Sequence, residues 1–291
     1  MRLDDYRSSD NVGDQRGQSF GGGGGGGGLG LLINLVGSRF GIGGIIVVML
    51  GAMLFGFNPF GGGGTNVAPQ STAVGASAAA KACAVDAAST FSCRVLASTE
   101  DTWAKLFAER GQKYPPAGFI FYGGQGQSGC GAAQSAMGPF YCPTDNRIYL
   151  DTSFYNELQN RFGAAGDFAQ AYVIAHEVGH HIQYLEGTLD KAHKAQASAS
   201  TAEGNAIQVK VELQADCYAG VWGGRNRDRL EPGDIEEGLR AASAIGDDTL
   251  QKAAQGRVVP ESFTHGSAEQ RMRWLKRGLE TADPAACDTF A

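Results

Sequence analysis

The sequence predicts an α+β fold that is predominantly helical, contains a small sheet and is preceded by one transmembrane helix. Three observations support this fold class. An apolar stretch without a charged side chain runs from residue 40 to residue 57. After residue 80, most segments repeat their apolar side chains with the spacing of an α-helix. Two short apolar runs between turn residues have the pattern of β-strands instead.

The chain divides into four parts by composition. Residues 1–28 are polar and then almost pure glycine, which cannot bury enough apolar surface to order a chain, so we expect a disordered tail. Residues 29–57 form a hydrophobic segment, in which residues 40–57 have about the length of a membrane-spanning helix. Residues 58–80 are uncharged and rich in small residues, as in a flexible linker. Residues 81–291 then form one soluble domain.

The positive charges around the apolar stretch predict its orientation. Arg2, Arg7, Arg16 and Arg39 precede it, and no Lys or Arg follows it until Lys81. Lys and Arg mark the cytoplasmic flank of a span, so we expect a cytoplasmic tail and a periplasmic or otherwise extracytoplasmic domain on a single-pass membrane protein. A cleaved signal peptide is the alternative, but the sequence before the apolar run is longer than the usual leader.

The composition also bears on partners. The net charge is -6 at pH 7, and Lys and Arg are scattered, so the chain lacks the basic footprint of a nucleic-acid-binding protein. All six cysteines follow the apolar stretch, and none forms a CxxC pair. Disulfides are plausible for such a set in an oxidising compartment. Cys130 and Cys142 bracket a loop that a disulfide would stiffen, whereas the sequence leaves the other pairings open.

The elements of the soluble domain follow from local patterns. An amphipathic helix is expected over Ser98–Arg110, where Ser98 and Asp101 have the spacing of a capping box. Short strands are expected at 119–122 and 147–150, among Gly, Pro and Asp residues. After residue 166 the pattern is helical, with helices expected at 167–186, 202–222, 233–254 and 267–281.

The expected helix 167–186 carries the strongest chemical motif. His176 and His180 are four residues apart, so both side chains lie on one face of the helix, one turn apart, and can bind a single zinc ion. Glu177 lies about 100° around the helix, beside such an ion, where it can act as general base towards a metal-activated water. The alternative is a pair of core histidines, but uncompensated polar groups on an apolar helix are costly.

A catalytic zinc ion needs a third protein ligand. Glu212 and Asp216 share a face of the expected helix 202–222. We expect Glu212 to complete the metal site and Asp216 to accept the second ring N–H of a ligating histidine. A solvated acidic stripe is the alternative, but apolar residues on the neighbouring faces argue against it.

Three other residues near the motif were weighed as ligands. Glu186 follows His180 by six residues, as a third ligand does in one class of zinc peptidases, but that class has glycine where Gln183 stands here. His193 lies in a polar, lysine-flanked stretch and is expected to be solvated. His181 is expected to pack or to support the site rather than to bind metal.

His265 is the remaining candidate for catalysis. We expect it to donate a hydrogen bond to the oxyanion, although it could instead belong only to the loop before Ser267, which caps the next helix with Gln270. The sequence thus predicts zinc-dependent hydrolysis of peptide or protein substrates, with Glu177 as the base. The alternative is a catalytically weak, zinc-stabilised scaffold or assembly factor of the cell envelope, but a structural site would not need Glu177.

Several segments carry a resemblance to a known family: Ser9-Asp10-Asn11-Val12, Gly138-Pro-Phe-Tyr-Cys-Pro143, His176-Glu-Val-Gly-His-His-Ile-Gln183, Glu212-Leu-Gln-Ala-Asp-Cys-Tyr-Ala-Gly220, and His265-Gly-Ser with Gln270-Arg271 and Trp274. They resemble the neutral zinc metallopeptidases of bacteria over nearly the whole chain. The resemblance implies a zincin-like, gluzincin-like domain, zinc, a membrane anchor and peptidase activity, but no particular substrate.

A more distant likeness is to the integral-membrane gluzincins of the CAAX-prenyl-protease type, which also pair HExxH with a later ExxxD. Here Gly266 stands where they have proline, and one anchor replaces their bundle of spans. In a zincin-like fold, the strand before the active-site helix presents its edge to an extended peptide. Arg147–Asp151 stands at that place in the chain, so we expect the substrate to pair with it as an added strand.

Overall fold

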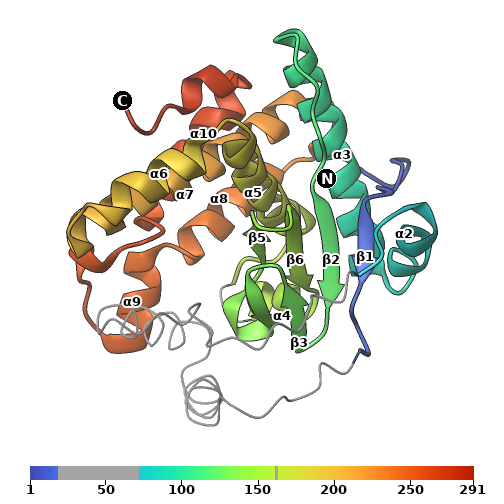
Figure 1. The fold of residues 1–291 in the computed structure, drawn as a ribbon, viewed down its shortest axis with the longest axis horizontal. Coiled ribbons are helices and arrows are strands. Elements are labelled where there is room, and N and C mark those ends of the chain that lie inside the picture. Colours follow the sequence, from blue (N-terminus) through green and yellow to red (C-terminus); the bar gives the residue numbers. More distant parts are fainter. Residues whose placement is uncertain (19–71, 161–162) are drawn as a thin grey trace.

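The computed structural model of the chain describes residues 1–18, 72–160 and 163–291 (Figure 1). Its helices are α2 Ala76–Ala82, α3 Ala87–Glu109, α4 Ser153–Asn160, α5 Asp167–Leu185, α6 Thr188–Ala197, α7 Thr201–Arg225, α8 Asp234–Ala244, α9 Asp247–Gln255 and α10 Ala268–Thr281. Its strands are β1 Val12–Asp14, β2 Gly118–Tyr122, β3 Gln125–Ser128, β4 Gly131–Gln134, β5 Phe140–Cys142 and β6 Arg147–Asp151. The described part is predominantly helical with a small sheet, as the sequence predicts.

Four strands form the main sheet in the order β1-β2-β6-β5. Strands β1, β2 and β6 are parallel, whereas β5 is antiparallel to β6. Strands β3 and β4 form a separate antiparallel hairpin. The prediction that β6 offers a free edge is therefore wrong, because the short strand β5 pairs with that edge. The edge strands of the main sheet are β1 and β5.

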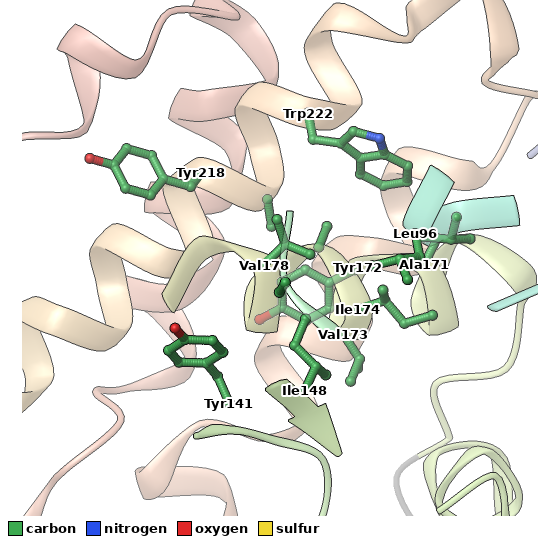
Figure 2. Close-up of a cluster of buried hydrophobic side chains, with 14 of the residues drawn as sticks. Leu96, Tyr141, Ile148, Ala171, Tyr172, Val173, Ile174, Val178, Tyr218 and Trp222 are labelled. Atoms are coloured by element: carbon green, nitrogen blue, oxygen red, sulfur yellow. The ribbon is translucent and has the colours of Figure 1, made fainter. Parts of the chain in front are cut away.

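Both faces of the main sheet are buried. One face packs in the large helical core through Phe119, Phe121, Ile148 and Leu150. Figure 2 shows Ile148 among the core side chains of α5, including Val173 and Ile174. The other face carries Ile120, Tyr122, Tyr149 and Cys142, which pack with Ala133 of the hairpin. Because alternate side chains point to opposite faces, two covered faces make the strands continuous apolar runs in the sequence.

Two glycines allow helices α7 and α10 to pack at close range. A Cβ atom on Gly278 would lie 2.0 Å from the carbonyl oxygen of Cys217. A Cβ atom on Gly220 would lie 2.2 Å from the carbonyl oxygen of Leu275. Any larger residue at these positions would collide with backbone that cannot move independently of its helix. The glycines thus set how near α10 comes to the helix that carries Glu212.

The helix predicted over 233–254 is two helices in the structure, α8 and α9. They are separated at Gly246, which approaches the start of α10 closely. A Cβ atom on Gly246 would lie 2.4 Å from the backbone nitrogen of Ala268. This close approach is a tertiary contact, so a local helical pattern does not reveal the break.

The helix predicted to start at Ser98 starts earlier. Helix α3 begins at Ala87, and the Asp86 side chain caps it by accepting a hydrogen bond from the backbone N–H of Ser89. Ser98 lies buried in the middle of the helix, where its hydroxyl oxygen accepts a hydrogen bond from Trp222 Nε1 at 3.0 Å. The predicted capping box at Ser98 is therefore wrong.

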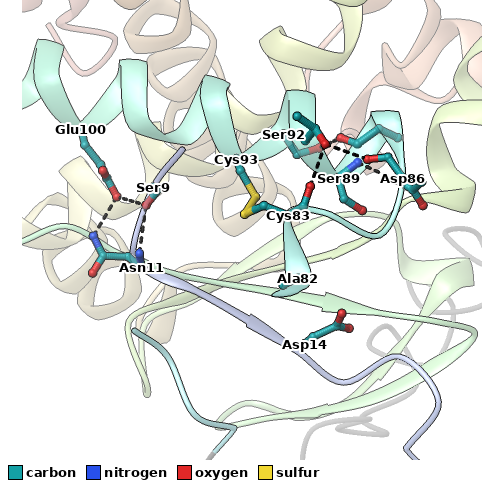
Figure 3. The surroundings of a disulfide bond; sticks show 12 residues. Ser9, Asn11, Asp14, Ala82, Cys83, Asp86, Ser89, Ser92, Cys93 and Glu100 are labelled. Atoms are coloured by element: carbon teal, nitrogen blue, oxygen red, sulfur yellow. Dashed lines mark hydrogen bonds between the residues drawn. A yellow bond between two sulfur atoms is a disulfide. The ribbon is translucent and has the colours of Figure 1, made fainter. Parts of the chain in front are cut away.

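The start of the chain is part of the fold, so the prediction of a disordered tail is wrong for residues 1–18. Strand β1 pairs with β2 and extends the sheet. The side chains of Ser9 and Asn11 donate hydrogen bonds to Glu100 on α3 at 2.6 and 2.8 Å (Figure 3). These polar residues are ordered because partners in the protein satisfy them. Helix α2 likewise begins inside the segment predicted as a linker.

The predicted membrane topology is also wrong. No helix among the described residues has the length and apolarity that a bilayer requires, and residues 40–57 lie outside the described part of the chain. Strand β1 shares a sheet with the domain, and the side chain of Gln15 donates a hydrogen bond to Thr72 Oγ1 at 2.8 Å. A single span would place these segments on opposite sides of a membrane. The predicted localisation as a single-pass protein with an extracytoplasmic domain is therefore overturned.

Three disulfides fasten the domain. Cys130 pairs with Cys142, as predicted from the loop that they bracket. Cys83 pairs with Cys93 between α2 and α3, beside the N-terminal segment (Figure 3). Cys217 on α7 pairs with Cys287 near the C-terminus, across 70 residues of sequence. The last disulfide ties the end of the chain to the helix that carries Glu212.

Candidate metal centre

The two histidines of the motif and a glutamate from a later helix lie together. His176 and His180 are on α5, and Glu212 is on α7. Glu212 Oε2 lies 3.2 Å from His176 Nε2 and 3.6 Å from His180 Nε2. One nitrogen or oxygen atom from each residue lies within 4.8 Å of the others. The structure thus brings the three predicted ligands to one point.

Gly179 allows the two ligand-bearing helices to cross closely. A Cβ atom at this position would lie 2.9 Å from the carbonyl oxygen of Ala215 and 3.0 Å from its Cα atom. Ala215 is itself fully buried on α7. Glycine within the motif His-Glu-Val-Gly-His therefore brings α7 near enough for Glu212 to reach the histidines of α5.

A carboxylate fixes the tautomer of His176. His176 Nδ1 lies 2.8 Å from Asp216 Oδ1. A carboxylate oxygen only accepts hydrogen bonds, so Nδ1 must carry the proton. In the neutral imidazole, the lone pair of Nε2 then faces Glu212, in the orientation that a metal ligand requires. Asp216 therefore lies where the sequence analysis places it, behind a histidine and not at the ligand point.

An amide fixes the tautomer of His180. His180 Nδ1 lies 2.8 Å from Gln183 Oε1. The Gln183 amide nitrogen donates to the carbonyl oxygen of Val211 at 2.7 Å, so its oxygen is left to accept. Nδ1 of His180 must therefore donate, and its Nε2 also presents a lone pair to Glu212. Both imidazoles are held in the same tautomer by different partners.

Asp216 is held as a charged carboxylate by a buried network. Arg271 on α10 donates through Nε to Asp216 Oδ2 at 2.8 Å and through Nη2 to Oδ1 at 2.9 Å. The Tyr172 hydroxyl donates to Oδ1 at 2.6 Å. Burial raises the pKa of Asp216, but Arg271 and His176 outweigh burial and lower it to about 2. Asp216 therefore stays ionised and keeps His176 in place.

The charge of the site fits a divalent cation. Burial lowers the pKa of His176, but Asp216 and Glu212 outweigh it and raise the value to about 10, so the carboxylates favour positive charge here. Gln208 donates to Glu212 Oε1 at 3.0 Å and leaves Oε2 towards the histidines. Two imidazole nitrogens and one carboxylate oxygen are a donor set of catalytic zinc sites. The residues present therefore fit zinc.

Glu177 lies in the wall of the same cavity. Burial raises the pKa of Glu177, and Glu212 raises it further, whereas His180, His176 and a hydrogen bond from the backbone of Tyr141 lower it; the result is a raised pKa. A buried carboxylate with a raised pKa accepts a proton more readily than an exposed glutamate does. Glu177 thus has the position that a general base would need.

His265 reaches the cavity from the loop before α10. Its backbone N–H donates to Asp247 Oδ2 at 2.6 Å, and its Nδ1 lies 3.3 Å from Asp247 Oδ1. Burial lowers the pKa of His265, but the hydrogen bond to Asp247 outweighs it, so the pKa is raised. Ser267 and Gln270 form the predicted capping box of α10. The predicted cap is therefore confirmed, and His265 itself lines the cavity, whereas its role towards an oxyanion stays a prediction.

The cavity beside the three ligands has a volume of about 370 Å³. Phe140 and Tyr141 of β5 line it, together with side chains from α4 to α7 and α9. The edge strand beside the centre is therefore β5, and not β6 as the sequence predicts.

The alternative ligands lie elsewhere. Glu186 accepts hydrogen bonds from Arg110 Nη1 at 2.9 Å and from the Tyr218 hydroxyl at 2.7 Å. Glu186 does not belong to the group of His176, His180 and Glu212. His193 is exposed at the cavity wall.

His181 supports the site without joining it. Its ring lies between two segments, with Nε2 2.7 Å from the carbonyl oxygen of Pro115 and Nδ1 3.0 Å from the Tyr141 hydroxyl. Burial lowers the pKa of His181. A neutral His181 therefore links α5 to β5 directly beside the cavity.

Five residues around the centre were given no role by the sequence analysis: Tyr172, Gln183, Gln208, Asp247 and Arg271. Two of them had a local signal. Gln183 follows His180 by three residues, and Gln208 precedes Glu212 by four, so each shares a helix face with the residue that it supports. Arg271 and Asp247 act from other elements, and no local spacing connects them to the site.

The chain is similar to known proteins over its whole length. It matches the family described as "Putative neutral zinc metallopeptidase" over residues 1–290. It is 47% identical over 295 residues to "Uncharacterized protein YpfJ" of Escherichia coli strain K12, covering 100% of this chain and 99% of that protein. It is 43% identical over 215 residues to "Uncharacterized protein Rv2575" of Mycobacterium tuberculosis strain H37Rv, covering 68% of this chain and 70% of that protein. No solved structure matches it. The donor set of the centre agrees with this family description. The match over residues 1–290 shows that the chain belongs to this neutral zinc metallopeptidase family.

Proposed function

We propose that the protein is a zinc-dependent peptidase that hydrolyses peptide bonds in extended segments of peptides or proteins. The observation that carries the proposal is the convergence of His176, His180 and Glu212 at a cavity whose wall also holds Glu177. A structural zinc ion is enclosed by four protein ligands, whereas a catalytic one keeps a position open. Three donors beside a cavity, with a buried carboxylate next to them, support catalysis over a purely structural role.

The protein's own residues would hold and aim the metal. His176, His180 and Glu212 would bind zinc, which supplies Lewis acidity towards the substrate carbonyl and a water molecule. Asp216 and Gln183 hold the two Nδ1–H groups, so both Nε2 atoms keep their aim. Such support from neighbouring groups increases metal affinity.

Two further residues would move or stabilise charge during hydrolysis. Glu177 would accept a proton from the water while the oxygen of that water bonds to the carbonyl carbon of the substrate. It would then pass that proton to the amine nitrogen as the carbon–nitrogen bond breaks. His265, held by Asp247, would donate a hydrogen bond to the carbonyl oxygen as negative charge builds on it.

Strand β5 would position the substrate. It is an edge strand of the main sheet, and its residues Phe140 and Tyr141 line the cavity. Tyr141 and Glu177 line the same cavity, so β5 borders the residue proposed as the base. An extended peptide would pair with this side as an added strand and lay one of its peptide bonds beside the metal.

The test separates hydrolysis from metal binding in the full chain. Glu177→Gln should retain stoichiometric zinc but lower kcat roughly 100- to 10,000-fold, because the amide cannot accept the proton. His180→Ala should lose both zinc and cleavage. Zinc is measured by elemental analysis, and cleavage is measured with a mixed peptide library. Glu186→Gln is the matched control, since the same change at the residue directly after α5 lies outside the metal group. Undiminished cleavage by Glu177→Gln would overturn the proposal.

A further inference from the structure

The cavity extends beyond the groups that the proposed chemistry uses. Its remaining lining is largely apolar and comes from several helices, with Phe154, Val173, Leu189, Val211, Ile245 and Leu250 among its walls. Its volume of about 370 Å³ is near the lower end of the range for ligand pockets, about 300–1,000 Å³. A cavity of this size admits the side chains of an extended peptide, but not a folded element.

The apolar wall begins directly beside the metal ligands. Val173 precedes His176 by three residues on α5, so the two side chains share one face of the helix. Val173 is 5% exposed and belongs to the hydrophobic core. The side chain of a substrate residue next to the scissile bond would therefore contact the methyl groups of Val173 directly beside the metal ligands.

Another part of the wall is formed by Ile245 and Leu250, at the break between α8 and α9. Asp247, which holds His265, lies between them on the same stretch of chain. The residue proposed to bind the carbonyl oxygen is thus fixed to the apolar wall. The segment from Ile245 to Leu250 would therefore set both the position of the substrate carbonyl, through His265, and the contact with a substrate side chain.

The cavity offers no spare charge to a charged substrate side chain. Apart from the residues proposed for zinc and catalysis, the only acidic, basic or histidine side chains among its described lining residues are Arg271 and His193. Arg271 is 3% exposed and is engaged by both carboxylate oxygens of Asp216. His193 is on the exposed face of α6. An ionised substrate side chain would lose its hydration here without gaining a partner, which is unfavourable.

We propose that this cavity selects substrates with an apolar side chain at a residue adjoining the scissile bond. The inference rests on the proposed peptidase function and specifies its substrate class. Leu250 is the specificity-determining residue best suited to a test. It is only partly buried, so an aspartate there would remain solvated enough for the domain to fold.

The first test is a cleavage profile of the full-length, zinc-loaded protein on a peptide library. Leucine should exceed aspartate next to the scissile bond by about tenfold or more in kcat/KM, the size of effect that apolar pockets give. Leu250→Asp should remove most of this preference and increase the relative cleavage of peptides with Lys or Arg. Leu239→Asp is the matched control, because Leu239 is also partly buried but lines a separate surface depression. Its profile should not change.

A second measurement does not depend on hydrolysis. Two peptide hydroxamates that differ only in a leucine or an aspartate side chain are titrated calorimetrically against the zinc-loaded protein. The leucine compound should bind about tenfold tighter, and Leu250→Asp should narrow the difference. Equal affinities of the two hydroxamates, or a cleavage profile without apolar preference, would overturn the inference about substrate selection. Peptide cleavage in the same experiment would still support the proposed peptidase function. Selective binding without any cleavage would support the pocket and contradict the proposed function.

Discussion

The amino nitrogen of Met1 lies 2.7 Å from Asp167 Oδ1, across 166 residues of sequence. Asp167 is the first residue of α5, so the contact fastens the N-terminal segment to the start of the helix that carries the motif. The amine also lies 3.1 Å from both Glu231 Oε2 and Asp234 Oδ1. Asp167, Asp234 and Glu237 have the spacing of a metal group, but two of them bind this amine. We therefore assign the cluster to the amine and not to a second metal.

This contact makes stability depend on pH. Burial lowers the pKa of the Met1 amine, but Asp167, Asp234 and Glu231 outweigh it and raise the pKa above its ordinary value of 8.0. A group whose pKa is raised by folding stabilises the fold fully below its unfolded pKa, and this stabilisation is lost as pH rises through the folded pKa. We therefore expect Tm to fall as pH increases above 8, as measured by circular dichroism at a series of pH values.

An N-terminal extension provides the control for this pH effect. Adding Gly-Ser before Met1 moves the charge out of the carboxylate cluster. We expect Tm at neutral pH to fall on the order of 5 °C and its decline above pH 8 to weaken. The same two residues added after Ala291, which is exposed, should change neither property. If both extended chains unfold like the unmodified protein at every pH, the amine contact does not stabilise the fold.

Gly179→Ala should weaken zinc binding. The new methyl group would press on the backbone of Ala215 at about 3 Å, so α7 must move away and carry Glu212 from the histidines. Overpacking of this kind costs about 1–3 kcal/mol, which corresponds to roughly a 5- to 150-fold loss of metal affinity if the cost falls on metal binding. Competition with a chelator measures the affinity. Gly204→Ala on α7 is the control, because a Cβ atom there meets no other atom within 4 Å. Equal zinc affinity in both variants would contradict the close-crossing argument.

Arg271→Lys should lower zinc affinity by about 10- to 100-fold, the range for loss of an outer-shell partner. Lysine cannot reproduce the two parallel hydrogen bonds that Arg271 makes to Asp216, so the carboxylate would lose its orientation and release His176. Arg273→Lys is the matched control, since Arg273 is exposed on the same helix. Chelator competition gives the affinity, and Tm reports any general loss of folding. Tight zinc binding by the Arg271 variant, at unchanged Tm, would show that Asp216 does not need this support.

The sequence could predict the donor set because its geometry is local. His176 and His180 share a helix face at four residues' spacing, and Glu212 and Asp216 do so on another helix. Helical periodicity therefore places each pair without knowledge of the tertiary fold. Arg271 is 55 residues from Asp216, and only the packing of α10 against α7 joins them. Asp247 holds His265 from the start of α9, which is separated from α8 at Gly246. This interruption of the helix depends on a tertiary contact, and no helical pattern reveals it.

The errors at the start of the chain have a different origin. The prediction of a disordered tail treated residues 1–18 like the glycine run that follows them, because both are poor in apolar residues. The polar side chains of residues 1–18 nevertheless have specific partners, such as Glu100. Strands β1 and β5 are three residues long each, which is too short for a period-two pattern to be recognised. The prediction therefore missed both edges of the sheet, and with them the strand that borders the cavity.

Tyr141 connects this edge strand to helix α5 through His181. The carbonyl oxygen of Pro115 can only accept, so His181 Nε2 carries the proton, and Nδ1 competes with Asn146 Oδ1 for the proton of the Tyr141 hydroxyl. Tyr141→Phe leaves Nδ1 buried without this donor, at a cost of about 1–3 kcal/mol, and loosens β5 against α5. Zinc content should not change, because no ligand is touched.

If β5 positions the substrate, the Tyr141→Phe variant should raise KM for library peptides several-fold, with a smaller change in kcat. A loss of stability alone would not move KM at temperatures well below Tm. Tyr184→Phe is the control, because Tyr184 also stacks on His181 but is 37% exposed. Steady-state kinetics on both variants, with zinc content measured in parallel, decides the matter. An unchanged KM in the Tyr141 variant would mean that the substrate does not rely on β5, and its binding edge would have to be sought elsewhere on the cavity rim.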